Sequence, residues 1–258
     1  MRAANRIAAL MAAFAVAGCN PSPQASAPVN AGPISAEPAT LTAADGVKVT
    51  GVYTRATNPK ALILLFHQAE SGKDEYALIA PRLAQAGYSS LRIDQRAGGA
   101  MFGANATVQA LGHATGYLEA RPDLEAALAW AKDKKLPVVL WGSSYSASLA
   151  FLVAADHPDA VRAVMAFSPG EYFDDKTLVA KAAAKVKAPV FVTSAQDGHE
   201  IDAARAILDA VPSSDKQQFV PKLGGVHGSS TLLRARNPEG AEPAWKAVMA
   251  FLAGVTKG

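Results

Sequence analysis

The chain has 258 residues, of which half are hydrophobic and 18% are charged, and its formal net charge is +3. This length and composition predict a soluble globular protein with one large α/β domain or two small ones. Arg2 and Arg6 lie in a predicted targeting segment, and without them the net charge falls to +1. No block of Lys or Arg then resembles a phosphate-binding stripe, so nucleic acid is not an expected partner.

Residues 1–18 have the pattern of a signal peptide. The two arginines precede an apolar stretch, residues 7–17, that is too short for a membrane-spanning helix but suits a signal. The stretch ends in Val16-Ala17-Gly18-Cys19, which resembles the lipobox of bacterial lipoproteins. That resemblance implies that Cys19, the only cysteine, carries a lipid that anchors the protein to a membrane of the cell envelope. Asn20 favours the outer membrane by the same analogy, and a plain secretory signal with a soluble periplasmic or secreted product is the alternative.

Residues 19–39 are rich in Pro, Ala and Ser and carry almost no charge. Such a segment cannot bury a core, so it is predicted to be a tether. The folded domain is then expected to cover residues 40–258.

Strand and helix patterns alternate along this domain, which predicts a mainly parallel sheet with helices on both faces. The turn signal Asp45-Gly46 predicts that the sheet opens with an antiparallel hairpin. The strands are expected at residues 40–42, 47–54, 61–66, 89–93, 137–141, 161–167, 190–193 and 217–220. The helices are expected at residues 74–86, 122–134, 146–156, 177–186, 201–211 and 241–255, with a long Gly/Ala-rich segment at 94–120.

The segment 137–149 predicts a sharp turn from a buried strand into a helix. At its centre, Gly142-Ser143-Ser144-Tyr145-Ser146 has the nucleophile-elbow pattern, with serine in place of the usual final glycine. Ser146 is small enough for the turn but is expected to crowd it slightly. A hydroxyl at this position is held clear of its own backbone, next to a helix N-terminus that stabilises negative charge. Ser144 is therefore the candidate nucleophile, and an ordinary strand-to-helix loop is the alternative.

A serine nucleophile needs a base and a group that orients the base. After a nucleophile elbow, these partners follow in the order Asp or Glu, then His. Asp197 follows the strand at 190–193, and His227 lies among glycines before the last helix, so they are the predicted acid and base. Alternatively, Asp197 caps a helix and His227 lies in a surface turn.

Other acids and bases compete for these roles. Glu171 is the second-ranked acid, with Asp174 and Asp175 close behind it in sequence. His199 is an alternative base, although it is only two residues from Asp197 and the two side chains are expected to point apart.

Two backbone N–H groups are expected to form an oxyanion hole, that of Tyr145 after the nucleophile and that of Gln68 after the strand at 61–66. Glu70 either orients the second of these loops or lies in solvent. The histidine spacing and the single cysteine do not suit a metal site, and no dinucleotide-binding glycine motif follows the first strand. No cofactor is expected.

With its elbow, its Phe66-His67-Gln68 strand end and the loops around Asp197 and His227, residues 40–258 resemble the α/β-hydrolase superfamily, closest to its dienelactone-hydrolase-like branch. Dienelactone hydrolases use a cysteine nucleophile. Because Cys19 lies at the N-terminus, only Ser144 can serve here, which puts a dienelactone substrate in doubt.

The resemblance implies an α/β-hydrolase fold with a sheet of about eight strands. It also implies a serine hydrolase that cleaves a small-molecule carboxylic ester through an acyl-enzyme on Ser144. A serine peptidase or acyl-aminopeptidase is one alternative. A non-catalytic, lipid-anchored binding protein on a hydrolase scaffold is the other.

Overall fold

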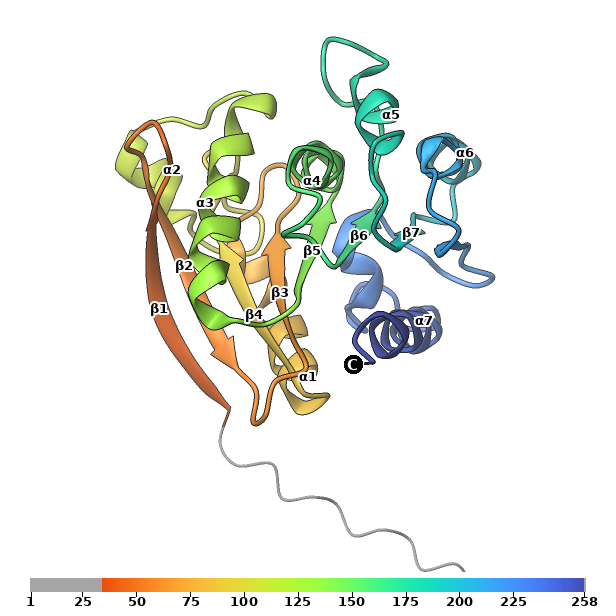
Figure 1. Cartoon of the computed structure of the whole chain (residues 1–258), viewed down its shortest axis with the longest axis horizontal. Coiled ribbons are helices and arrows are strands. Elements are labelled where there is room, and N and C mark those ends of the chain that lie inside the picture. The colour runs from red at the N-terminus through yellow and green to blue at the C-terminus, as the bar shows by residue number, and fades with distance from the viewer. Residues whose placement is uncertain (1–33, 258) are drawn as a thin grey trace, which may run out of the picture. The chain divides into compact units, whose positions relative to one another are not determined.

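An eight-stranded sheet forms the centre of the fold in the computed structural model, which describes residues 34–257 (Figure 1). The strands lie in the order β1-β2-β4-β3-β5-β6-β7-β8. Their bounds are β1 Ser35–Thr42, β2 Lys48–Arg55, β3 Ala61–Phe66, β4 Tyr88–Ile93, β5 Val138–Ser143, β6 Ala163–Phe167, β7 Val190–Thr193 and β8 Lys216–Phe219.

The sheet begins antiparallel and continues parallel. β1 pairs with β2, and β2 with β4, in antiparallel register, as the Asp45-Gly46 turn predicts. From β4 through β3 and on to β8, all pairs are parallel, so the carboxyl ends of these strands meet at one edge of the sheet. The loops that follow β3, β5, β6, β7 and β8 therefore lie at the same edge. This is the edge at which the sequence places its candidate residues.

Helices cover both faces of the sheet (Figure 1). α3, α4, α5 and α6 share one core with the sheet, and α1 and α7 share the other. The helices are α1 Ile79–Gln85, α2 Ala106–Leu111, α3 Arg121–Ala131, α4 Tyr145–Asp156, α5 Leu178–Ala183, α6 Gly198–Ala210 and α7 Ala241–Val255. The 3₁₀ turns are η1 Lys73–Tyr76, η2 Leu118–Ala120, η3 Lys132–Lys134 and η4 Gly228–Leu232.

The period-2 geometry of a strand explains how one sheet serves both cores. Along β3, Leu62, Leu64 and Phe66 belong to the core under α3 and α4, whereas Ile63 and Leu65 belong to the core under α1 and α7. All six residues of β3 are buried, as expected for a strand that is covered on both faces. β3 and β5 are thus held rigidly, which fixes the loops that follow them.

The predicted α/β-hydrolase architecture with eight strands is confirmed, but some element bounds differ. β1 begins at Ser35, inside the segment predicted to be a tether. The helix predicted at 74–86 is divided into η1 and α1. α6 begins at Gly198, earlier than predicted, because Asp197 caps it. The predicted signal peptide and Cys19 lie outside the described residues. No helix within residues 34–257 is long and apolar enough to cross a membrane.

Candidate active site

Ser144 lies at a sharp turn between β5 and α4. Its backbone has φ +61° and ψ −125°, a combination that residues with a side chain rarely adopt. The Ser144 N–H donates to Phe167 O at 2.7 Å, which ties the turn to the end of β6. The residue is only 6% exposed. This strained strand-to-helix turn is the geometry of a nucleophile elbow.

The small residues that flank the elbow have different reasons to be small. A Cβ at Gly142 would lie 2.4 Å from the backbone N and Cα of Ala147, so only glycine fits there. Ser146 does not crowd the turn as expected. Its hydroxyl accepts from Ser143 N at 2.9 Å and lies 2.7 Å from Phe66 O, to which it can donate. Ser146 therefore joins the elbow to the end of β3.

His227 is paired with a carboxylate, and that carboxylate belongs to Glu200. His227 Nδ1 lies 2.8 Å from Glu200 Oε1, and the other carboxylate oxygen accepts from Ala195 N at 3.1 Å. Burial acts to raise the pKa of Glu200, but hydrogen bonds with His227 and Ser168 outweigh it and lower the pKa to about 2. Glu200 is therefore ionised at neutral pH, as a group that orients and stabilises an imidazolium must be.

The loop that carries His227 is bonded directly to the elbow. Ser229 N donates to Ser143 Oγ at 2.9 Å, and Gly228 N donates to Ser168 Oγ at 2.9 Å. A Cβ at Gly228 would lie 2.4 Å from Ser143 Oγ. The residues just after the histidine thus contact the residue just before Ser144. The structure brings the predicted nucleophile and the predicted base to one place.

Asp197 is not paired with His227, which corrects the predicted acid. Asp197 is the N-cap of α6, and its Oδ1 accepts from His199 N at 3.0 Å and from Glu200 N at 3.2 Å. The helix therefore starts just after Asp197 and presents Glu200 from its first turn. The sequence Asp197-Gly198-His199-Glu200 has the spacing of a capping box, and this signal could have identified the helix start.

The other candidate acids and bases are also bonded elsewhere or exposed. Glu171 accepts from Val179 N at 2.9 Å and from Ala180 N at 2.8 Å, so it caps α5. Asp175 is exposed and bonds Thr177 and Lys181, and Asp174 is exposed as well. His199 is exposed on α6 and lines a cavity described below.

Gln68 does not offer a free N–H, which corrects the predicted oxyanion donor. Its N–H donates to Glu75 Oε2 at 2.8 Å. The next amide, that of Ala69, has no hydrogen-bond acceptor among residues 34–257. Tyr145 is the first residue of α4, so its N–H has no partner within the helix. The amides of Ala69, next after Gln68, and of Tyr145, next after Ser144, are therefore the candidate donors to an oxyanion.

His67 holds the loop that follows β3. Its backbone N–H donates to Gln95 Oε1 at 2.7 Å, and its ring Nε2 accepts from the backbone N–H of Gln95 at 2.8 Å. The proton is then on Nδ1, which lies 2.8 Å from Gln68 O. Burial lowers the pKa of His67 to about 4, so the ring is neutral and acts as a structural link.

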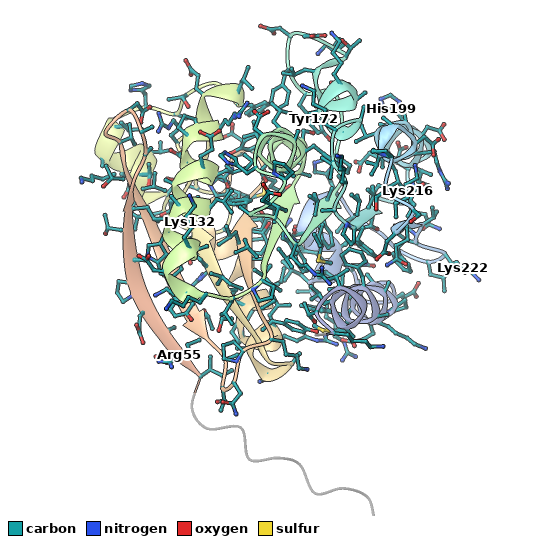
Figure 2. All side chains as sticks on the ribbon, in the orientation of Figure 1. Arg55, Lys132, Tyr172, His199, Lys216 and Lys222 are labelled. Carbon is teal, nitrogen blue, oxygen red and sulfur yellow. The ribbon has the colours of Figure 1, made fainter. Side chains whose placement is uncertain are left out.

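A cavity of about 650 Å³ opens beside His227, between α5 and α6. His227 and Glu200 lie at its lining, and much of the rest is apolar, with Ala180, Ala203 and Ile207 among the residues. Tyr172 and His199 also line it, and Figure 2 labels Tyr172 between α4 and α5 and His199 beside α6.

Tyr172 connects this cavity with the elbow. Its hydroxyl donates to Ser168 O at 2.9 Å. Burial raises the pKa of Tyr172, while a hydrogen-bonding contact with the Ser144 side chain acts in the opposite direction. Ser168 directly follows Phe167, whose carbonyl accepts from Ser144 N, so Tyr172 links the cavity to the elbow. Within the part of the chain that the structure describes, no group of three or more His, Cys, Asp or Glu side chains is placed to hold a metal ion.

Comparison with known proteins bears on the family and the fold of the chain. The family model described as serine aminopeptidase, S33, matches residues 57–222. No curated protein sequence matches the chain. Among solved structures, the chain is similar to a dienelactone hydrolase from Anabaena variabilis, with a TM-score of 0.67 and 17% identity over 86% of this chain and 98% of that one.

Two further structures have the same fold. An esterase from Pyrococcus furiosus gives a TM-score of 0.67 at 17% identity, over 86% of this chain and 93% of that one. A soluble variant of monoglyceride lipase from Saccharomyces cerevisiae gives a TM-score of 0.61 at 13% identity, over 90% and 98% of the two chains.

Proposed function

Because the chain belongs to the serine aminopeptidase S33 family and is a serine hydrolase, we propose that it cleaves small carboxylic esters through an acyl-enzyme on Ser144. The observation that carries this proposal is that His227 is paired with Glu200 of α6 and lies on a loop that is bonded to the strained elbow of Ser144. A carboxylate, an imidazole and a serine in this arrangement can activate the serine hydroxyl.

In the proposed mechanism, His227 takes the Ser144 proton while Oγ attacks the ester carbonyl carbon. The carbonyl electron pair moves onto oxygen, and the N–H groups of Ala69 and Tyr145 stabilise the resulting oxyanion. The carbonyl then re-forms, the bond to the alcohol oxygen breaks, and His227 returns the proton to that oxygen. Water, deprotonated by His227, attacks the acyl-enzyme in the same way and releases the acid. Glu200 stays ionised and stabilises the imidazolium throughout.

The charges of the cavity favour an ester over a peptide with a free amino terminus. An ammonium group is bound most strongly by a free carboxylate. The two carboxylates that line this cavity are both engaged, Glu171 by amides of α5 and Glu200 by His227. Lys176 adds a positive charge to the lining, which disfavours an ammonium group there. A neutral ester with an apolar acyl or alcohol group suits this cavity better than a peptide with a free amino terminus.

Labelling with a fluorophosphonate probe tests the proposed nucleophile. The folded protein should take up one probe, and mass spectrometry should locate it on Ser144, because only an activated serine reacts with this electrophile. The Ser144→Ala variant should take up none. A folded wild-type protein that neither reacts with the probe nor turns over p-nitrophenyl esters would favour the non-catalytic alternative. Cleavage of amino-acyl arylamides in preference to every ester would favour the peptidase.

The cavity between α5 and α6 predicts which substrates are preferred. Ala203→Trp should narrow it and reduce kcat/KM about tenfold for esters with long alkyl chains, relative to short ones, because each buried CH₂ contributes about 0.8 kcal/mol. Two substrate series, p-nitrophenyl esters of increasing acyl length and acetates of increasing alcohol length, show which arm occupies the cavity. Arg205→Trp is the control, since Arg205 is exposed on α6 outside the lining. An unchanged chain-length preference in both series would exclude the cavity as the binding site.

A further inference from the structure

Glu75 is a buried carboxyl group close to the candidate active site that the mechanism above does not use. It lies in η1 and is 1% exposed. Its two oxygens accept from two different segments, Oε2 from Gln68 N at 2.8 Å and Oε1 from Ser143 Oγ at 2.7 Å. Both donors are neutral. Burying a carboxyl group against neutral donors is costly, so an apolar side chain would serve better if the position only filled space.

The bonds of Glu75 extend to a third segment. Ser143 Oγ, which donates to Glu75, also accepts from Ser229 N at 2.9 Å. One continuous chain of hydrogen bonds therefore joins the loop after β3, the elbow and the loop that carries His227. Each segment is held within two residues of a group that the mechanism needs. Gln68 precedes Ala69, Ser143 precedes Ser144, and Ser229 follows His227 by two positions.

The bond from Gln68 has a further effect on the loop after β3. A backbone N–H that is bonded to Glu75 cannot also donate to a substrate oxygen. Glu75 thereby withdraws the Gln68 amide from this role and leaves the next amide along the loop, that of Ala69, without an acceptor among residues 34–257. Without the carboxylate, the Gln68 N–H would lose its buried acceptor, and the loop would have to rearrange to satisfy it.

We propose that Glu75 is a positioning residue that aligns the Ala69 amide, Ser144 and His227 for the tetrahedral transition state. This inference rests on the proposed function. Because alignment matters most when charge develops on the carbonyl oxygen, loss of Glu75 acts mainly on the chemical step. Substrate binding in the cavity, whose lining does not include Glu75, is affected little.

Burial brings the change of charge of Glu75 close to neutral pH. Burial raises the pKa of Glu75 to about 7, with its hydrogen bonds and the charge of His227 opposing the shift. Burial also raises the pKa values of the neighbouring phenols Tyr76 and Tyr145 well above 10, so both stay neutral. Since the pKa of Glu75 is higher in the folded protein than its ordinary value of 4.5, folding favours the protonated form. The stability that this form contributes is present below about pH 4.5 and is lost as the pH rises towards 7.

The test compares Glu75→Gln, Glu75→Ala and the control Glu70→Gln, which alters an exposed carboxylate of the same loop. Rates are normalised to the number of sites that react with the fluorophosphonate. Glu75→Ala should lower kcat about 100-fold and Glu75→Gln about tenfold, with KM within about threefold of wild type. Affinity for a boronic acid, which mimics the tetrahedral state, should fall by the same factors as kcat. Glu70→Gln should match the wild type in all of these measurements.

Other results would overturn either the role of Glu75 or the proposed function. An active wild type whose kcat and boronic acid affinity are unchanged in Glu75→Gln and Glu75→Ala overturns the role of Glu75 and leaves the proposed function standing. A loss confined to KM does the same. A folded wild type that turns over no substrate overturns the proposed function, and this inference with it. If Glu75→Ala does not fold, Glu75→Gln decides. Urea unfolding of the wild type and of Glu75→Gln between pH 4.5 and 7 is a further check. The wild type should lose stability as the pH rises, and Glu75→Gln should not.

Discussion

Glu200→Gln is expected to lower kcat by about 10³- to 10⁴-fold at nearly constant KM, whereas Asp197→Asn should leave both within about threefold of wild type. Glutamine at position 200 keeps the size of the side chain but removes the charge that lies 2.8 Å from His227 Nδ1. A neutral amide cannot stabilise the imidazolium that forms when Ser144 loses its proton. Its NH₂ group, if it faces the ring, also favours the wrong tautomer.

Asp197→Asn is a matched control, because it removes one carboxylate charge only three positions away. Asparagine Oδ1 can still accept from the N–H groups of His199 and Glu200, so the cap of α6 survives. Steady-state kinetics on one p-nitrophenyl ester, together with fluorophosphonate labelling rates, separate the two variants. If Asp197→Asn lost as much activity as Glu200→Gln, the charge of Asp197 would be essential to catalysis, and the assignment of Glu200 as the acid would be wrong.

Local sequence patterns predicted the strands and the candidate nucleophile. Each buried strand of the parallel part was predicted by its apolar run, and Ser144 by the small residues around it. Those signals are local, because period and turn chemistry are read within a few neighbouring residues. The order Ser, acid, His also directed the prediction to the segment that follows β7, where both Asp197 and Glu200 lie.

What the sequence did not predict depends on contacts between distant segments. Asp197 and Glu200 are both carboxylates near the same strand end, and only the start of α6 decides which one reaches His227. The cap at Asp197 turns the backbone into the helix, which directs Glu200 towards the histidine. An earlier helix start, taken from the capping-box spacing, would have favoured Glu200.

The oxyanion loop differs from its prediction for the same kind of reason. Gln68 is the second residue after β3, where a donor is expected, but its N–H is bonded to Glu75, seven positions further along the chain. No pattern in the sequence predicts that bond. Ser146 is a third case, since its hydroxyl bonds Phe66 O, eighty residues away, and so stabilises the turn it was expected to crowd.

Gly142→Ala is the second large effect, with kcat/KM expected to fall about 10²- to 10³-fold although no reacting group is changed. The added Cβ would lie 2.4 Å from the backbone of Ala147 and from Ser146 O. None of these atoms belongs to a flexible side chain, so relief requires α4 to move away from β5. That movement displaces both the Ser144 hydroxyl and the Tyr145 N–H, and misplacement of about 1 Å can cost about 100-fold in rate.

Gly254→Ala is the control for the cost of adding a methyl group to a glycine. A Cβ at Gly254, in α7, meets no atom within 4 Å, so this variant should keep full activity and gain up to about 1 kcal/mol of stability from its better helix propensity. For Gly142→Ala, overpacking should cost about 1–3 kcal/mol in urea unfolding. A Gly142→Ala enzyme that is destabilised but retains its kcat would mean that α4 can shift without moving the nucleophile. The link between the tight turn and the placement of Ser144 would then be wrong. Position 146 differs from position 142. It has room for a side chain, and the Ser146 hydroxyl bonds both β3 and the elbow, whereas position 142 has room for no side chain.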